Sequence, residues 1–171
     1  MPTEISGSTG VNKIQDGTVV AGDLAGSVAL GKVLQVKVGT STATATQDIA
    51  TTTYTDIDGM SATITPSAGS KILCMWTIYT VRQQNEAYGT KLLRDSTEVW
   101  SPNGTWSLYE AASGASGARS VDSFTHYDTP TGANGSTAFT YKVQCATYSS
   151  NNVGFNEDGQ KTQLVLMEIA G

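Results

Sequence analysis

A single histidine limits the catalytic chemistry open to this chain of 171 residues. His126 lies in the alternating run 123–127, and no second imidazole is present for a multi-histidine metal arrangement. No reactive nucleophile or orienting acid is recognisable beside it, as a Ser-His-Asp or Cys-His mechanism would require. We therefore interpret His126 as a hydrogen-bonded strand residue, predict no catalytic residue, and expect that the chain is not an enzyme.

The best acidic pair, Asp56 and Asp58, precedes Gly59. Two carboxylates fall short of the roughly six oxygen ligands that Ca²⁺ needs, so we predict a turn before a strand that begins near Met60. The run 157–159, Glu-Asp-Gly, likewise predicts a hairpin turn. The sequence thus indicates neither a metal site nor a cofactor.

Two tryptophans allow one binding interpretation. Trp100 and Trp106 flank the turn-like run 101–104 and would form an exposed aromatic platform for glycan, or else two hairpin residues that pack on the core. Cys74 and Cys145 each lie in an apolar, strand-like run, which predicts buried free thiols rather than a disulfide.

The charge pattern excludes several partners. Only 15% of the residues are charged, the net charge is -5, and the basic residues are scattered singly, so we expect no nucleic acid partner. No window approaches the roughly 20 apolar residues of a membrane span, so no membrane partner is expected. Residues 1–4 lack the basic-then-apolar order of a secretion signal, which predicts assembly in a cytoplasm.

The elements that must position these residues are strands, because apolar and polar side chains alternate from Val33 onward. In the run 137–148 the alternation is clearest. The apolar residues that share one face of that run are Phe139, Tyr141, Val143 and Cys145. The other predicted strands and strand centres are 33–38, 60–65, 71–82, 92–94, 98–100, 105–110, 119–127 and 162–169. This spacing predicts an all-β fold, an antiparallel β-sandwich of jelly-roll type.

The run 71–82 is apolar on both faces. Its first face carries Ile72, Cys74, Trp76 and Ile78, and its second carries Leu73, Met75 and Tyr79. A strand of this kind is central in its sheet or lies under a subunit contact. We therefore predict a homotrimer with a subunit contact at Leu73, Met75 and Tyr79.

Residues 1–31 differ from the rest, because from Gly7 to Gly31 they hold small residues and isolated aliphatic ones without an aromatic ring. Such a segment cannot bury a core by itself. We predict an extended anchoring arm that precedes a β-sandwich knob of residues 32–171. The arm residues expected to bind a partner are Ile14, Val19, Val20 and Leu24.

Several short strings resemble small virion proteins of tailed bacteriophages, which are often described as tail-fibre-like. They are GVNKIQDGTVV (10–20), with residues 23–24 and 31–35, then YTDIDGMSATITP (54–66), residues 70–73, residues 92–95 and KTQLVLMEI (161–169). The resemblance implies a phage particle and a trimer with a jelly-roll or tumour-necrosis-factor-like knob. No long repeat typical of a fibre shaft is present.

Two roles follow from this resemblance, both in a virion assembled in the host bacterial cytoplasm. The first is a capsid decoration, or cement, protein whose partner is the major capsid protein. The second is a short tail fibre or receptor-binding knob, attached to a tail component, that contacts host glycan. A third role, as a hydrolase acting on that glycan, lacks an acid pair at usable spacing.

Overall fold

The computed structural model describes residues 33–42, 45–82, 86–102, 108–109 and 117–171. All of them belong to the compact unit Lys32–Gly171. The predicted arm lies outside the described residues.

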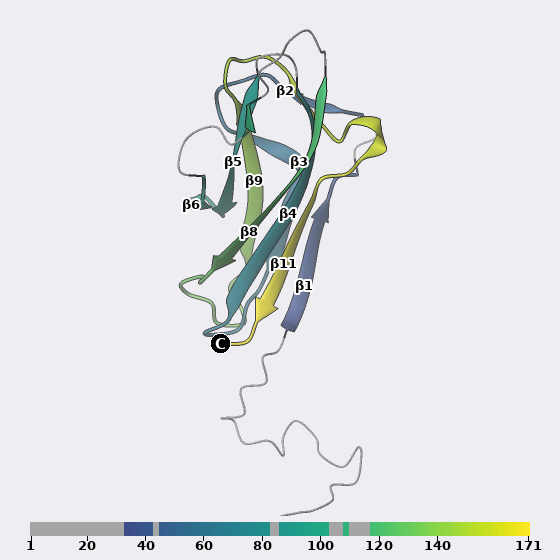
Figure 1. Cartoon of the computed structure of the whole chain (residues 1–171). Coiled ribbons are helices and arrows are strands. Elements are labelled where there is room, and N and C mark those ends of the chain that lie inside the picture. Colours follow the sequence, from purple (N-terminus) through teal and green to yellow (C-terminus); the bar gives the residue numbers. More distant parts are fainter. Residues whose placement is uncertain (1–32, 43–44, 83–85, 103–107, 110–116) are drawn as a thin grey trace, which may run out of the picture. The chain divides into compact units, whose positions relative to one another are not determined.

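The described unit is all-β, as predicted (Figure 1). Its strands are β1 (Val33–Thr40), β2 (Gln47–Ile49), β3 (Thr55–Ile64), β4 (Lys71–Arg82), β5 (Ala87–Arg94), β6 (Thr97–Trp100), β7 (Leu108–Tyr109), β8 (Ala118–Asp128), β9 (Phe139–Thr147), β10 (Val153–Phe155) and β11 (Gln163–Ile169). One short 3-10 helix, η2 (Glu157–Gly159), separates the last two strands.

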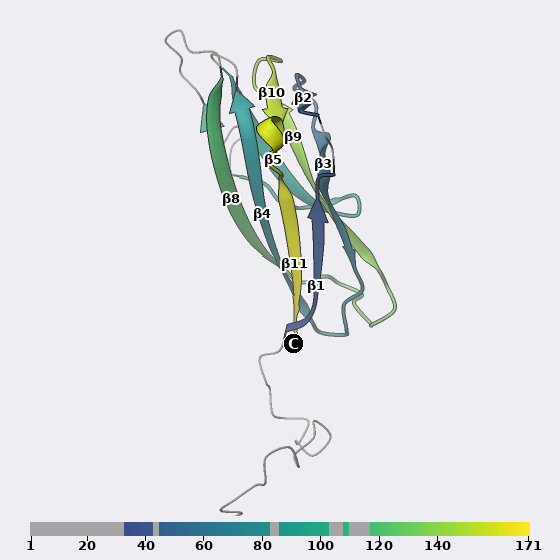
Figure 2. The ribbon, with the colours of Figure 1, turned by 90° about the vertical axis from the view of Figure 1, so that its right-hand side faces the viewer.

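The strands form two antiparallel sheets. Sheet A has the order β1-β11-β4-β10-β2, with β8 on the other edge of β4, and sheet B has the order β3-β9-β5-β6, with β7 also on β5. Figure 2 shows β8, β4, β11 and β1 side by side. Because β10 and β11 pair with successive stretches of β4, they occupy one position in sheet A.

By the same reasoning β1 and β2, which pair with β11 and β10, count as one strand, and so do β6 and β7, which both pair with β5. The described part of the chain then has eight strands in sequence order. Sheet A holds the first, eighth, third and sixth of them side by side, and sheet B holds the second, seventh, fourth and fifth. This is the strand order of a jelly roll, so the predicted fold class is confirmed.

The core lies between the sheets. It is formed by the apolar side chains that occupy alternate positions along the strands. Ile72, Cys74, Trp76 and Ile78 of β4 point inward and are at most 1% exposed. Phe139, Tyr141, Val143 and Cys145 of β9 face them from sheet B and are all buried. Since β4 is paired on both edges along its length, it is also the central strand that its apolar character predicted.

The prediction of a turn before Met60 was wrong. Asp56 and Asp58 lie inside β3, at a point where its register with β9 shifts between Asp56 and Ser61. Gly59 adopts a φ of 77° there, and a Cβ at this position would lie 2.1 Å from the Cα of Ser41. The glycine therefore allows the chain after β1 to pass close to β3 at its irregular point. β3 continues through this point, whereas the predicted turn would have ended the strand.

The prediction of a hairpin at 157–159 was also wrong. These residues form η2, and the strands on either side of it pair with β4 rather than with each other. In the predicted hairpin between β5 and β6 the loop is Asp95-Ser96, because Arg94 already pairs with Thr97. Asp95 takes the positive φ of 55° that such a short loop requires.

Candidate interaction surface

The outward side of sheet A carries two complete rows of cross-strand neighbours that are almost entirely apolar. The first row, across β1, β11, β4 and β8, is Val36, Met167, Leu73 and Tyr127. The second row is Val38, Val165, Met75 and Thr125. Since directly opposed residues share a face of the sheet, these side chains form one surface.

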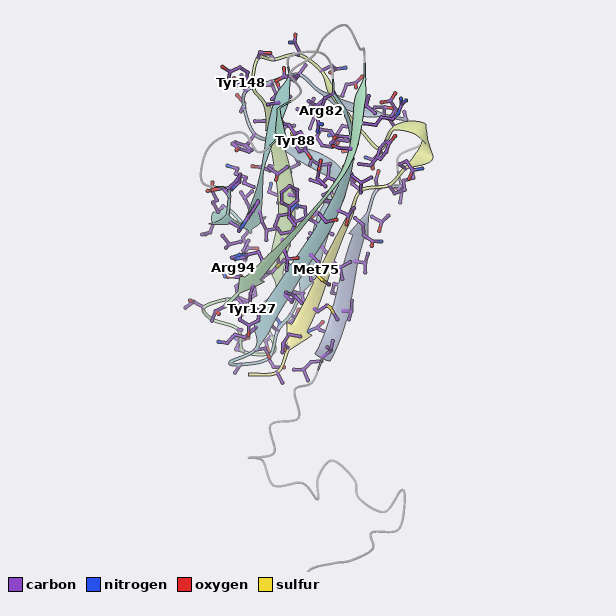
Figure 3. The ribbon with its side chains drawn as sticks, viewed as in Figure 1. Met75, Arg82, Tyr88, Arg94, Tyr127 and Tyr148 are labelled. Atoms are coloured by element: carbon purple, nitrogen blue, oxygen red, sulfur yellow. The ribbon has the colours of Figure 1, made fainter. Side chains whose placement is uncertain are left out.

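A polar row, which includes Thr77 and Ser123, separates these rows from another apolar pair, Tyr79 and Val121. We call the two rows together with this pair the apolar face. Figure 3 marks Met75 on β4 and Tyr127 on the neighbouring β8. The predicted contact residues Leu73, Met75 and Tyr79 therefore lie on one face.

The apolar face is accessible to solvent in the described unit. Val38 is 53% exposed, Val121 is 64% exposed and Tyr127 is 56% exposed. The central residues Leu73 and Met75 are half-buried, because only their own neighbours cover them. Contiguous exposed apolar surface of this kind is typical of an interaction site.

The outward side of sheet B is different, because it is polar and internally hydrogen-bonded. Asp56 accepts hydrogen bonds from Lys142 Nζ at 3.0 Å and from Gln144 Nε2 at 2.6 Å. The hydroxyls of Thr63 and Thr140 lie 2.9 Å apart. The sandwich therefore has one polar outer side and one outer side that is largely apolar.

The Asp56 contacts also bear on the acidic pair Asp56 and Asp58, at which the sequence indicates no metal site. Burial raises the pKa of Asp56, but the hydrogen bonds from Gln144 and Lys142 outweigh it and hold that pKa below its ordinary value. The Lys142 ammonium already neutralises the carboxylate that a metal ion would need. In the described part of the chain no group of three or more His, Cys, Asp and Glu side chains is placed to hold a metal ion.

The acidic side chains of β8 point inward and join the two sheets. Asp122 accepts a hydrogen bond from the Tyr88 hydroxyl and another from Ser120 Oγ at 2.7 Å. Asp128 accepts hydrogen bonds from Arg94 Nη1 and from the Tyr141 hydroxyl. Burial, followed by the adjacent carboxylate, raises the pKa of both tyrosines, so their hydroxyls stay protonated and act as donors.

This geometry does not suit glycoside hydrolysis. Asp122 and Asp128 are six positions apart along one strand, which corresponds to about 20 Å, whereas paired catalytic carboxyls lie roughly 5 to 10 Å apart. His126 lies half-buried between them on β8, opposite Cys74 in the register. Its strand location is as predicted.

Both cysteines are buried free thiols. Burial, and then the nearby Asp128, raises the pKa of Cys74 to about 12. Burial likewise raises the pKa of Cys145, with Glu86 adding to the shift. Thiols held in the protonated form pack as small hydrophobic groups and are poor nucleophiles.

Of the two tryptophans, Trp100 packs against the core. Its ring meets Trp76 edge-on at 5.1 Å and lies 5.5 Å from Phe124, centroid to centroid. Trp106 lies outside the described residues, as do the arm residues Ile14, Val19, Val20 and Leu24.

A polar hollow of about 360 Å³ lies where β2, β4, β8 and β10 meet. It could not be predicted from the sequence, because its walls come from four separate segments, two of them at the unpredicted strands β2 and β10. Its lining residues are Thr46, Asp48, Val81, Arg82, Gly117, Arg119, Asn152, Gly154 and Glu157. Arg119 Nη2 and Glu157 Oε1 lie 4.0 Å apart at this hollow.

No protein-family model matches the chain, and no curated protein matches it. Solved structures with a similar fold include the infectious bursal disease virus VP2 subviral particle, with 13% identity and a TM-score of 0.48 over 80% of this chain and 33% of that one. Another is the T13 particle of the same virus, with 14% identity and a TM-score of 0.40 over 81% of this chain and 36% of that one.

The chain therefore spans about a third of the length of the solved chains that it matches. Likeness at this level concerns the β fold alone. Among the described residues, no helix has the length and apolar character that crossing a membrane requires.

Proposed function

We propose that the chain is a non-enzymatic structural protein of a tailed-bacteriophage virion, a trimeric capsid decoration protein that clamps neighbouring capsid subunits. It assembles in the host cytoplasm and remains in the particle. Its partners are two further copies of itself and the major capsid protein. The arm, through Ile14, Val19, Val20 and Leu24, grips the shell while the knob projects.

The apolar face carries this proposal. A jelly roll needs only one apolar side on each sheet to form its core, and the outward side of sheet B follows that rule. The outward side of sheet A breaks it with two rows in which only Thr125 is polar. An assembly protein uses such a surface, whereas a freely soluble monomer gains nothing from it.

Two further observations agree with a structural role. The strings that resemble phage virion proteins, such as 54–66 and 161–169, fall on β3 and β11 and their flanks, so they belong to the framework of the knob. The inward carboxylates of Asp122 and Asp128 are held by tyrosine and arginine or serine partners. They stabilise the sandwich.

Counting copies per particle tests the proposal. Phage encoding this chain would be purified, and labelled peptides from β4 and β9 would be measured by mass spectrometry against the major capsid protein of the same sample. A cement protein is expected in hundreds of copies and a tail fibre in only a few. Absence of the chain from purified particles would overturn the virion role altogether.

A second candidate, a receptor-binding knob of a short tail fibre, is favoured by the polar hollow. Carboxylates and a guanidinium around a concave site are groups that hydrogen-bond sugar hydroxyls. In this role Asp48 and Arg119 would hold host glycan. Binding to a glycan array that Arg119→Ala abolishes, together with a low copy number, would select this function over the first.

A further inference from the structure

We infer that the apolar face is the contact between copies of this chain, and that three copies turn it toward a common three-fold axis. This inference rests on the proposed function for the number of copies. The inference goes further by naming the surface through which the copies meet, which extends beyond β4 to β1, β11 and β8. In the trimer, each apolar face is thus covered by the apolar faces of the two other copies of the chain.

The first argument is the scarcity of other apolar surface. Among the described residues, the large hydrophobic side chains that are exposed lie on β1 or β8, with Tyr148 as the exception. The described part of the chain therefore has no second extended apolar surface to offer. Among the described surfaces, the apolar face of another copy is the one with matching chemistry, so the contact brings like surfaces together around a symmetry axis.

The second argument is charge. The chain has a net charge of -5, which opposes association between copies. The outward positions of β1, β11, β4 and β8, all within the described residues, nevertheless carry no Asp or Glu. The acids of these strands, such as Asp122, Asp128 and Glu168, are on the inward side. Copies can therefore meet at this face without bringing carboxylates together.

The third argument is size. Four strands about 4.8 Å apart make a face roughly 19 Å wide, and β4 alone is about 40 Å long. The outward side of these strands, of which the apolar face is a part, thus covers at most about 760 Å², close to the roughly 800 Å² per partner of a standard interface. If three such faces, each about 19 Å wide, formed the sides of a triangular prism, each would lie about 5.5 Å from the three-fold axis. Two packed sheets are roughly 10 Å apart, so each lies about 5 Å from the plane midway between them, which is close to this distance.

The composition of the face also fits a subunit contact. Met75, Met167 and Tyr127 are of the residue types that are enriched at the centres of protein interfaces, and the two rows contain no charged residue. Two basic residues outside the face, Lys71 and Arg119, are on the same outward side at the two ends of the β4–β8 pair. They form the charged rim of the contact.

The test is the solution mass of the full chain, measured by size exclusion with multi-angle light scattering at micromolar concentration. The wild type is expected at three times the 17.9 kDa of the chain. Thr125→Asp and Val38→Asp each place a charge on the face and should lower the mass to one chain. Both side chains are exposed, so the knob should keep its β-sheet circular dichroism and its cooperative melt.

The matched control is Thr63→Asp, the same substitution at an exposed position on the outward side of sheet B. It should leave the mass at three chains. A monomeric wild type would overturn the inference, and a dimeric one would overturn the three-fold arrangement. Trimers in all three variants would show that another surface joins the copies. None of these outcomes bears on the presence of the chain in the virion, which the copy number tests separately.

Discussion

The Tyr141 hydroxyl donates a 2.6 Å hydrogen bond across the sandwich to Asp128, from β9 in sheet B to the end of β8 in sheet A. The same Asp128 oxygen, Oδ2, accepts a 2.6 Å hydrogen bond from Arg94 Nη1. One buried carboxylate thus connects three strands at the edge of the jelly roll. Because β8 is an edge strand of sheet A, this connection fixes it against sheet B.

We predict that the two partners of this bond differ in their effect on stability. Tyr141→Phe keeps the ring and loses one hydrogen bond, which should cost about 1 kcal/mol. Asp128→Ala leaves the largely buried Arg94 guanidinium and the Tyr141 hydroxyl without their acceptor and should cost about 3 kcal/mol. Urea denaturation followed by tryptophan fluorescence measures both changes. Equal losses would mean that Arg94 finds another partner.

The register of β9 gives a second prediction. Phe139 is buried, whereas the neighbouring Thr140 points outward to the Thr63 hydroxyl. Phe139→Ala should therefore cost about 3 to 5 kcal/mol through the cavity it leaves, and Thr140→Ala should cost less than about 1 kcal/mol. Thermal melts of the two variants check this. If the losses were equal, the strand would be shifted by one residue.

A third prediction concerns acid stability. Burial raises the pKa of Glu86, but hydrogen bonds from Ser149, Ala87 and Asn151 outweigh it and hold that pKa below its ordinary value. The carboxylate therefore stabilises the fold fully above its unfolded pKa of about 4.3, and the contribution is lost as the pH falls through the lower folded value.

Glu86→Gln should accordingly lower the free energy of unfolding at pH 7 by about 2 kcal/mol, since it replaces a charged acceptor with a neutral one. The difference from wild type should shrink below pH 4. Chemical denaturation at a series of pH values measures this, with the exposed Glu98→Gln as control. A constant difference at all pH values would refute the charge effect and leave only packing.

The sequence predicted the strands that are long and either regularly alternating or apolar on both faces. Residues 137–148 carry apolar residues at every second position and residues 71–82 form a long apolar run, so the inward side of β9 and the central strand β4 follow directly from the pattern. It did not predict β2 or β10. Each has three residues, too few for a period to show. β10 forms where β4 extends past β11 and leaves its edge open, and β2 pairs in turn with β10.

Irregular pairing was the other source of error. The alternation placed Leu34 with Val36 and Val38, but a register shift between Val33 and Gln35 interrupts the pairing at Leu34. The interaction surface could be predicted only in part for a related reason. Leu73, Met75 and Tyr79 stand out within one strand, whereas the rows that they join depend on β1, β8 and β11, whose pairing the sequence does not reveal.

The last prediction concerns the arm, residues 1–31. The core between the two sheets is built, among the described residues, from residues 49–166, none of which belongs to the arm. Deleting the arm should therefore leave a soluble, β-rich protein that melts cooperatively, with a midpoint close to that of the full chain. Circular dichroism melts measure this directly.

Attachment should be lost in the same variant. The arm holds isolated aliphatic residues, Ile14, Val19, Val20 and Leu24, that can be buried only against a partner. Particles stripped of the native protein should rebind the full chain in a sedimentation assay and should not rebind the truncated one. A full-length variant with Val19→Asp and Val20→Asp separates loss of contact from loss of length and should also fail to rebind. Equal rebinding by all three proteins would show that the knob carries the attachment surface, and the apolar face would then be the first place to look for it.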